Sequence, residues 1–330
     1  MPQTDLAPHQ PRDLLELAPL PTGRGVLVAG SPHAGPGHWA GAPSAVLVDG
    51  CYYLAYRLRR PVGSGRGFAV AIARSDDGQR FTPLLLLHAD DFGAESLERP
   101  ALVRTPDGRW RLYVSCATPG TKHWRIELLE AADPAAFRPA DARVVVPGDD
   151  RFGVKDPVVL RHDGAWHMWA CFHPLDEVGE EDRMETRHAT SADGIAWSWD
   201  ARSLAGRPGR WDSRGTRISC VAFRGDAAVA YYDGRASKAE NYEERTGVAV
   251  SADGRQFEAV GDAPAAVSPY GGTGLRYVAS VPLAGATRLY YEMTTADGTH
   301  GLMTELVGSP VTEGQPADHL LVPHQAPATA

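Results

Sequence analysis

The chain has 330 residues, of which 43% are hydrophobic and 22% are charged, and its formal net charge is −8 at pH 7. This composition is typical of a soluble globular protein, and the negative charge argues against a general nucleic-acid-binding protein. No apolar run approaches the about 20 residues of a membrane helix, and the N-terminus lacks the pattern of a signal peptide. We therefore expect a cytoplasmic protein without a membrane partner.

The first elements along the chain are an N-terminal extension over 1–24 and a short apolar strand over 25–30. Helical periodicity is nearly absent, and only 13–17 indicates a turn of helix. From residue 42 onward the sequence is dominated by short apolar strands that alternate with Gly-containing or polar turns. This pattern predicts an all-β protein.

A seven-residue motif recurs along these strands. Its three full copies read Ser-x-Asp-Gly-x-x-Phe or Trp and span 75–81, 191–197 and 251–257, and a degenerate copy spans 131–137. The copies start at 75, 131, 191 and 251, which are 56, 60 and 60 residues apart. Each motif is a tight turn followed by the aromatic residue that opens the next strand.

A second pattern recurs in step with the first and defines five repeats. Each repeat is a strand, a turn and a strand rich in Tyr, Trp and Val, and each has room for about four antiparallel strands. This organisation predicts a five-bladed β-propeller over 25–310, closed by the strand at 25–30 and followed by a tail over 311–330. The blades are predicted at roughly 42–88, 99–146, 156–204, 217–261 and 275–307.

The four cysteines lie far apart in the sequence and form no Cys-x-x-Cys pair. They are Cys51, Cys116, Cys171 and Cys220, and each lies in an apolar run. We expect buried, reduced thiols, in agreement with a cytoplasmic protein.

The loops that enter the first strand of each blade and those that join strands two and three emerge on one face of a propeller. In this sequence these loops are polar and contain aromatic residues, among them Trp39 and Tyr242. Aromatic rings among hydrogen-bonding groups suit sugars, whose ring faces are apolar and whose edges are polar. We therefore expect the functional site at this mouth, with Trp39 and Tyr242 as stacking candidates.

The repeats resemble a known group of enzymes. Two repeats open with Arg99-Pro100 and Asp156-Pro157, continue with an Asp-Gly turn and an aromatic strand, and are followed by the Ser-x-Asp-Gly motif or its degenerate copy. This order of motifs is similar to that of the five-bladed propeller glycosidases. These include glycoside hydrolase family 43 and the family 130 phosphorylases. The resemblance covers about residues 30–307 and implies a saccharide or small-molecule substrate.

The family 43 pattern implies three carboxylates at the mouth, in blades one, three and four. Asp156 matches the Asp of blade three that tunes the pKa of the proton donor. The matching place in blade one is Ala42, and Arg217-Ile218-Ser219 in blade four has no acid. Two of the three implied carboxylates are therefore absent.

Other acids could replace them. The candidates for catalysis are Glu98 in blade two and Glu243 and Glu244 in the blade-four loop, with Asp233 as a substrate-binding candidate. Glu98 and Asp156 could form an acid/base pair whose mutual repulsion separates their pKa values. The alternative is that both are structural, with Glu98 paired to Arg99 and Asp156 paired to a nearby cation.

Four cations are predicted at equivalent starts of the innermost strands, namely Arg99, Lys155, Arg217 and Arg276. Because guanidinium groups bind carboxylate or phosphate bidentately, they indicate an anionic ligand, and the alternative is ion pairing with Glu98 and Asp156.

Histidines in the mouth loops add a metal-dependent alternative. They are His33, His38, His123, His173 and His300, and His173 is also a substrate-binding candidate. No metal-binding spacing is present among them, so we assign no metal ligand and leave a divalent metal open.

The leading hypothesis is a carbohydrate-active enzyme that acts on a glycoside, or a sugar-like molecule with an anionic group, by acid/base catalysis. A non-catalytic glycan- or ligand-binding propeller is one alternative. A lyase or isomerase of small-molecule biosynthesis, recruited from this fold and using a metal, is the other.

Overall fold

The computed structural model describes residues 11–33, 35, 37–61 and 63–308. The predicted tail over 311–330 and the first ten residues of the predicted extension lie outside these ranges. Within the described residues the protein is all-β, with one short α-helix and four 3-10 turns. The prediction of an all-β protein is therefore confirmed.

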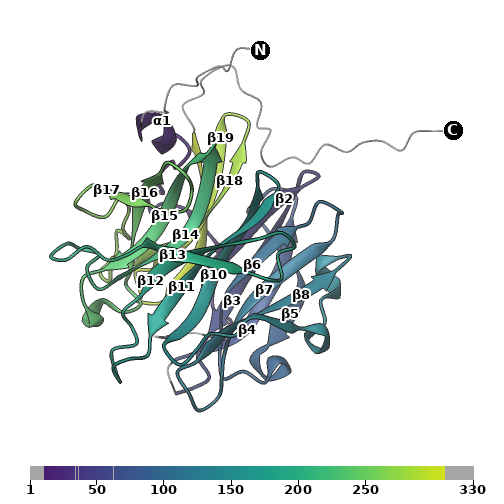
Figure 1. Cartoon of the computed structure of the whole chain (residues 1–330). Coiled ribbons are helices and arrows are strands. Elements are labelled where there is room, and N and C mark those ends of the chain that lie inside the picture. Colours follow the sequence, from purple (N-terminus) through teal and green to yellow (C-terminus); the bar gives the residue numbers. More distant parts are fainter. Residues whose placement is uncertain (1–10, 34, 36, 62, 309–330) are drawn as a thin grey trace, which may run out of the picture.

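The strands form antiparallel sheets that lie side by side (Figure 1). Three sheets have four strands each. They are β6 (Leu97–Arg104), β7 (Trp110–Ala117), β8 (Trp124–Ala131) and β9 (Arg143–Val146); β10 (Phe152–His162), β11 (Ala165–Pro174), β12 (Glu185–Ser191) and β13 (Ser198–Leu204); and β14 (Gly215–Arg224), β15 (Ala227–Arg235), β16 (Arg245–Ser251) and β17 (Glu258–Val260).

The fourth sheet has eight strands and two halves. One half is β2 (Trp39–Val48), β3 (Cys51–Arg59), β4 (Gly67–Ser75) and β5 (Thr82–His88), and the other is β18 (Leu275–Leu283), β19 (Ala286–Thr294), β20 (His300–Gly308) and β1 (Val26–Ala29). The halves are joined by one parallel pair, Trp39 opposite His300. The segment expected to complete the last repeat thus contains β1, which pairs antiparallel with β20.

The first strands of the repeats meet at a common centre. β2 contacts β6, β6 contacts β10, β10 contacts β14, β14 contacts β18, and β18 contacts β2 again. Five clusters of buried apolar side chains fill the interfaces between successive groups of strands, for example Leu54 against Tyr290 and Trp169 against Ala230. Each group of strands is therefore buried on both faces.

The Ser-x-Asp-Gly motif is a turn held by its own side chains. In the first copy, Asp77 Oδ1 accepts hydrogen bonds from the backbone N–H groups of Gln79 and Arg80, and Ser75 Oγ accepts from Gly78. Gly78 has a φ of 70°, in the left-handed region that favours glycine. The same bonds recur at 191–196, and largely at 251–256.

These turns also connect neighbouring sheets. Tyr113 on β7 donates its O–H to the carbonyl of Gly194, Trp169 on β11 donates its indole N–H to Gly254, and Tyr290 on β19 donates to Gly78. In each case an aromatic residue on the second strand of one repeat holds the turn of the next. The Tyr290 bond joins the last repeat to the first and so closes the ring.

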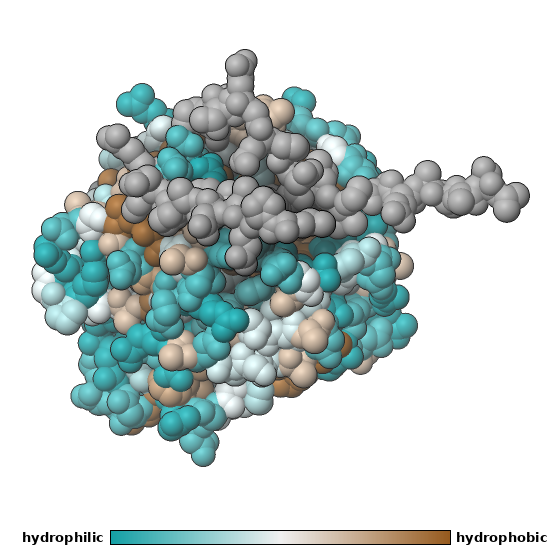
Figure 2. Space-filling model, turned by 45° about the horizontal axis from the view of Figure 1, so that its top comes forward, coloured by the Kyte–Doolittle hydropathy of each residue, from teal (hydrophilic) through white to brown (hydrophobic). Residues whose placement is uncertain are grey.

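The N-terminal residues pack on the last two repeats. α1 (Pro11–Leu15) begins before the predicted helical turn, and Leu14 and Ala18 join the apolar cluster of β15 and β19. Tyr231 donates its O–H to the Pro19 carbonyl. No helix in the described ranges is long and apolar enough to cross a membrane. On the face shown in Figure 2, hydrophobic residues are scattered among hydrophilic ones.

All four cysteines are free thiols. Cys116 and Cys171 are buried as expected, whereas Cys51 and Cys220 are half-buried. The prediction of buried thiols is therefore correct for two of the four, because the side chains of Cys51 and Cys220 are only partly covered by their neighbours.

The hydrogen bond that closes the ring leads to a prediction about stability. Tyr290→Phe removes the O–H that the buried Gly78 carbonyl accepts, and we expect the free energy of unfolding to fall by about 1–2 kcal/mol in urea denaturation. Tyr113→Phe should cost a similar amount because it removes the corresponding bond to Gly194. The control Tyr270→Phe, at an exposed ring, should have little effect, and an equal loss there would contradict the role of the turn contacts.

Candidate functional site

The innermost strands share an irregularity where they begin. In each, the pairing with the second strand shifts by a bulge, at Ala42, Arg99, Asp156, Ser219 and Tyr277. Ala42, Asp156 and Tyr277 have φ values of 52°, 56° and 55°, a left-handed conformation that is strained for a bulky residue such as Tyr277. The structure thus aligns Tyr277 with Asp156.

Just before the bulge, or one pair earlier in the fourth repeat, five residues of the first strands face five residues of the second strands. The pairs are Gly41 with Arg57, Glu98 with Ser115, Lys155 with Cys171, Arg217 with Asp233, and Arg276 with Glu292. Lys155, Arg217 and Arg276 are thus equivalent, as predicted. Arg99 is not, because Glu98 occupies that place in its strand and Arg99 belongs to the bulge. We call these ten residues the mouth ring.

Buried ion pairs run through the mouth ring. Arg57 pairs with Glu98 on β6 and, at 2.9 Å, with Glu292 on β19. Arg276 pairs with Glu292 at 2.6 Å and also with Glu244, which in turn pairs with Arg235. These side chains are almost completely buried, so each charge depends on its partners.

The carboxylates of this network are held in the ionised form. Burial is the largest single influence on Glu98 and by itself would raise its pKa, but Arg57, Lys155 and Arg59 together outweigh burial and hold that pKa well below its usual range. For Glu244 and Glu292, Arg276 and the other neighbouring cations together likewise outweigh burial and lower the pKa. Glu98 and Glu244 are therefore anions at neutral pH and poor proton donors.

The absence of a side chain at Gly41 leaves the space that the Glu292 carboxylate occupies. A Cβ atom at Gly41 would overlap the carboxylate of Glu292, so a larger residue would displace the acid that both Arg57 and Arg276 hold. The absence of a side chain at this place in the first repeat thus follows from packing.

Asp156 lies at the centre with no exposed surface and four polar contacts. Its carboxylate is 3.3 Å from Arg217, 4.0 Å from Lys155 and 3.4 Å from the Tyr277 hydroxyl, and it accepts a hydrogen bond from the Arg99 backbone N–H. Of the predicted structural pairings, those of Asp156 with Lys155 and Arg217 are present. Glu98 pairs with Arg57, which lies on β3 of the preceding repeat, and not with Arg99.

Asp233 shares Arg217 with Asp156. Arg217 donates to Asp233 at 2.9 and 3.0 Å, and Asp233 also accepts from the backbone N–H of Tyr277 at 2.9 Å. Burial raises the pKa of the Asp233 carboxyl above its usual range, although Arg217 acts against this. The structure therefore brings Asp156 together with Asp233, and one guanidinium connects the two carboxyl groups.

The centre of the ring is filled with side chains. Arg99 donates to the carbonyls of Pro43 on β2 and Ser219 on β14, so it spans three innermost strands. The Tyr277 ring is surrounded by guanidinium groups, of which Arg217 is the nearest at 3.8 Å from the ring centre. Arg99, Arg217 and Arg276 are all buried, so Lys155, with a side chain 14% exposed, is the most accessible of the four predicted anion-binding cations.

A further group of residues, of which Tyr242 and Glu243 are partly exposed and Trp39 and His300 are buried, lies where β2, β20 and the loop after β15 meet. Glu243, whose side chain is 28% exposed, is 3.1 Å from His300 Nε2 and accepts a hydrogen bond from Thr294 Oγ1. His300 stacks on Trp39 with ring centres 4.2 Å apart, and Trp39 meets Tyr242 edge to face at 5.2 Å. Burial opposes ionisation of Glu243, but the hydrogen bonds from His300 and Thr294 lower its pKa.

The histidines are distributed over different contacts. His173 Nε2 is 3.3 Å from the Cys171 thiol and its Nδ1 is 2.8 Å from the Glu181 carbonyl, whereas His33 contacts His38. His123 lies in the turn between β7 and β8, where its backbone N–H donates to Thr121. In the part of the chain that the structure describes, no three His, Cys, Asp or Glu side chains are grouped to hold a metal ion.

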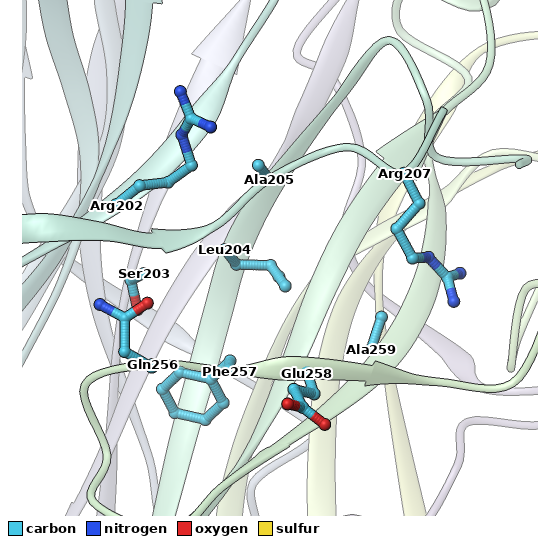
Figure 3. Close-up of a pocket in the computed structure, with 9 residues that line it drawn as sticks. All are labelled: Arg202, Ser203, Leu204, Ala205, Arg207, Gln256, Phe257, Glu258 and Ala259. Carbon is cyan, nitrogen blue, oxygen red and sulfur yellow. The ribbon is translucent and has the colours of Figure 1, made fainter. Parts of the chain in front are cut away.

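A shallow cleft of about 370 Å³ lies away from the mouth, between β13 and β17. Figure 3 shows Leu204 and Phe257 at its middle, with Arg202 and Arg207 toward its sides. None of the residues predicted to be functional lines this cleft.

The sequence analysis missed Arg57, Arg59, Tyr277 and Glu292. Arg57 and Glu292 lie two residues before the ends of the aromatic second strands of the first and last repeats, at the positions that Cys171 and Asp233 occupy in other repeats. A comparison of second strands as well as first strands would have indicated this set of positions.

No protein-family model and no curated protein sequence matches the chain. The structure is, however, similar to solved glycoside hydrolase-like propellers. A thermostable family-43 glycoside hydrolase has a TM-score of 0.63 at 13% identity, with 87% of this chain and 98% of that chain covered. A β-1,2-mannobiose phosphorylase from Listeria innocua has a TM-score of 0.58 at 14% identity, with 84% and 92% covered.

A third similar structure is a glycoside hydrolase-like protein from Parabacteroides distasonis, with a TM-score of 0.58 at 16% identity over 87% of this chain and 95% of that chain. At these identities the comparison shows the fold alone. The resemblance to propeller proteins of the family 43 and family 130 type, drawn from the repeats, is thereby confirmed.

The buried network predicts a large effect of one substitution. Glu292→Gln leaves the charges of Arg57 and Arg276 incompletely compensated, and we expect the free energy of unfolding to fall by about 3–5 kcal/mol. The control is Glu130→Gln, which removes a partly exposed carboxylate from Arg111 and Arg143 and should cost about 0–1 kcal/mol. Equal effects in urea denaturation would show that burial of the network contributes little.

His173 predicts a dependence of stability on pH. Burial, with a smaller contribution from Lys155, lowers the pKa of His173 to about 3, compared with about 6.5 in an unfolded chain. Because the folded value is the lower one, the stability from neutral His173 is fully present above pH about 6.5 and is lost as the pH falls toward 3.

The measurement is urea denaturation of the wild type and of His173→Gln at pH 7 and pH 4.5. The variant should lose less stability than the wild type over this interval, by about 2 kcal/mol. His123→Gln is the control and should follow the wild type, and a His173→Gln variant with unchanged pH dependence would contradict the assignment.

Proposed function

We propose that the protein is a carbohydrate-active enzyme of the propeller glycosidase and phosphorylase type, acting on a glycoside or a sugar-like small molecule that carries an anionic group. Its fold is shared with proteins named as a family-43 glycoside hydrolase and a mannobiose phosphorylase. The free cysteines favour a reducing compartment, so we also propose that it acts in the cytoplasm.

We infer that the fold is a propeller of five blades. The eight-stranded sheet would count as two blades, since a single residue pair joins its halves, and the contacts among the five first strands close a ring. On this count the blades follow the predicted repeats over 42–88, 99–146, 156–204, 217–261 and 275–307, with 25–30 in the last blade and the propeller as one domain over 25–310.

The observation that supports a catalytic mouth best is the accessibility of Glu243. The other predicted catalytic acids are buried and paired with arginines or Lys155, whereas the partly exposed Glu243 lies beside the ring system of Trp39, His300 and Tyr242. Tyr242 is the partly exposed ring of this group and precedes Glu243 in the chain, so a saccharide that packs on Tyr242 would reach Glu243.

In this proposal the chemistry belongs to Glu243. Glu243 is ionised at neutral pH, the form in which a carboxylate takes a proton from a water or hydroxyl nucleophile as a general base; its partial exposure supports this role, whereas its lowered pKa makes it a weaker base. His300 and Thr294 orient the carboxylate through hydrogen bonds. Asp156 acts as a positioning residue, because it holds Arg217 and the Tyr277 hydroxyl beneath the mouth and does not reach the surface.

A second candidate is a non-catalytic glycan-binding propeller. The observation in its favour is that Glu98, Asp156 and Glu244 are buried and ion-paired, so no second accessible carboxylate stands beside Glu243 among these predicted acids. Such a protein would bind the same saccharide without turnover.

The test is Glu243→Gln, assayed on a panel of glycosides with and without inorganic phosphate. We expect wild-type turnover and a decrease of kcat/KM by about 100-fold or more in the variant, since general base catalysis contributes this much. Glu240→Gln is the matched control, because Glu240 lies in the same loop with a side chain 34% exposed and pairs with Arg245. It should keep wild-type activity.

Each other outcome has a defined meaning. Saccharide binding by wild type without turnover of any glycoside selects the binding propeller. Turnover that is unchanged in Glu243→Gln would remove Glu243 from the mechanism. Asp156→Asn tests the positioning role of Asp156, because loss of a positioning residue should lower kcat with little change in KM.

A further inference from the structure

Arg59 is a buried cation that lacks a carboxylate partner. It ends β3, directly opposite Trp39, and is 3% exposed. Its guanidinium carbon lies 4.3 Å from the centre of the Trp39 ring and 4.2 Å from that of Tyr242. No carboxylate of the described residues is within ion-pair distance of it, and its buried Nε has no hydrogen-bond partner there.

The neighbouring charges explain why Arg59 remains uncompensated. Arg57, two residues earlier on the same strand, already holds Glu98 and Glu292. Burial lowers the pKa of Arg59, and the attraction of Glu98 only partly offsets burial. A cation in this position reduces the stability of the ligand-free protein unless cation–π contacts compensate fully, because burial removes its hydration.

The surroundings of Arg59 are organised for recognition. Tyr242, which forms one wall, has a φ of 77°, a conformation that is strained for tyrosine and is commonly found at functional sites. Trp39, the other wall, stacks on His300, which contacts Glu243. Arg59 is therefore adjacent to the residues that the proposed function assigns to the saccharide.

A second cation lies close by with only weak pairing. Arg66, in the loop after β3, has a side chain 34% exposed and approaches Glu95 only to 3.9 Å. The mouth thus has a buried cation without a carboxylate and a partly exposed one near it, whereas Arg217 and Arg276 are fully engaged by acids.

We propose that Arg59, walled by Trp39 and Tyr242, is the subsite that binds the anionic group of the ligand, a carboxylate or phosphate held by hydrogen bonds from the guanidinium. This inference rests on the proposed function, since it identifies the substrate as an acidic or phosphorylated saccharide. It also moves anion recognition away from Arg217 and Arg276, whose donors are all engaged by acids, and from Arg99, whose Nε and Nη2 donate to the backbone carbonyls of Pro43 and Ser219.

The melting temperature of the ligand-free protein distinguishes an anion-binding role of Arg59 from a purely structural role. Arg59→Met keeps much of the apolar stem and removes the unpaired charge, so we expect its melting temperature to equal or exceed that of the wild type. Arg57→Met, in contrast, breaks a buried ion pair and should lower the melting temperature. A decrease in Arg59→Met as large as that in Arg57→Met would overturn the proposal.

Binding is tested by thermal shift and calorimetry with D-glucuronate, D-glucose and inorganic phosphate. We expect wild-type protein to bind glucuronate or phosphate more tightly than glucose, and Arg59→Met to lose about 10- to 100-fold in affinity for the anion. The preferred anion identifies its source, a uronic acid or a phosphate. Arg60→Met is the matched control, since Arg60 is the next residue, stacks on Phe68 at 4.1 Å and should leave binding unchanged.

The outcomes distinguish this inference from the proposed function. Absence of anion binding by the wild type, or anion affinity equal in Arg59→Met and wild type, overturns the anion subsite even if neutral glycosides are turned over. Anion binding that depends on Arg59 supports the subsite, and if no glycoside is then turned over, only the proposed catalysis fails.

Discussion

The buried pairing of Arg57 with Glu98 and Glu292 determines how the rest of the mouth is built. The three residues come from β3, β6 and β19, so a single guanidinium fixes strands of three successive repeats at the centre. Charges this far from water are tolerated only with their partners, which explains why Gly41 leaves space for Glu292 and why Arg276 completes its coordination. The network therefore sets both the packing of the centre and the charge of each acid.

This network limits where chemistry can occur. The acids of this network neutralise buried arginines, so they are not accessible and do not release and accept protons near neutral pH. The centre therefore acts as a rigid support for the groups above it. Glu243 and Arg59 differ from the network in opposite ways: Glu243 is a partly exposed carboxylate, and Arg59 is a buried cation without an acid. A ligand that contacts both would have a sugar ring and a negative charge.

The repeats made the fold predictable. The Ser-x-Asp-Gly turns recur because each supplies a carbonyl to an aromatic side chain of the preceding repeat, as Gly78 does for Tyr290. The repeat predicted over 156–204, with about four strands, corresponds to β10 to β13, which begin at Phe152 and end at Leu204. Residues at the ends of strands were harder to align, and Arg99 was placed out of register with Lys155, Arg217 and Arg276 because a bulge adds a residue that spacing alone does not reveal.

The sequence by itself determined the all-β class, the repeats and their turns, and the loops that gather at one end, because local turn chemistry and strand periodicity encode them. It also identified Asp156, Lys155 and Arg217 as neighbours. Only the tertiary structure decided which charges neutralise one another: Glu98 pairs with Arg57, Asp156 shares Arg217 with Asp233, and Arg59 has no acid partner among the residues that the structure describes. These partners are far apart in the chain. Burial decides which of them remain available to a ligand, and the burial of a side chain cannot be read from the sequence alone.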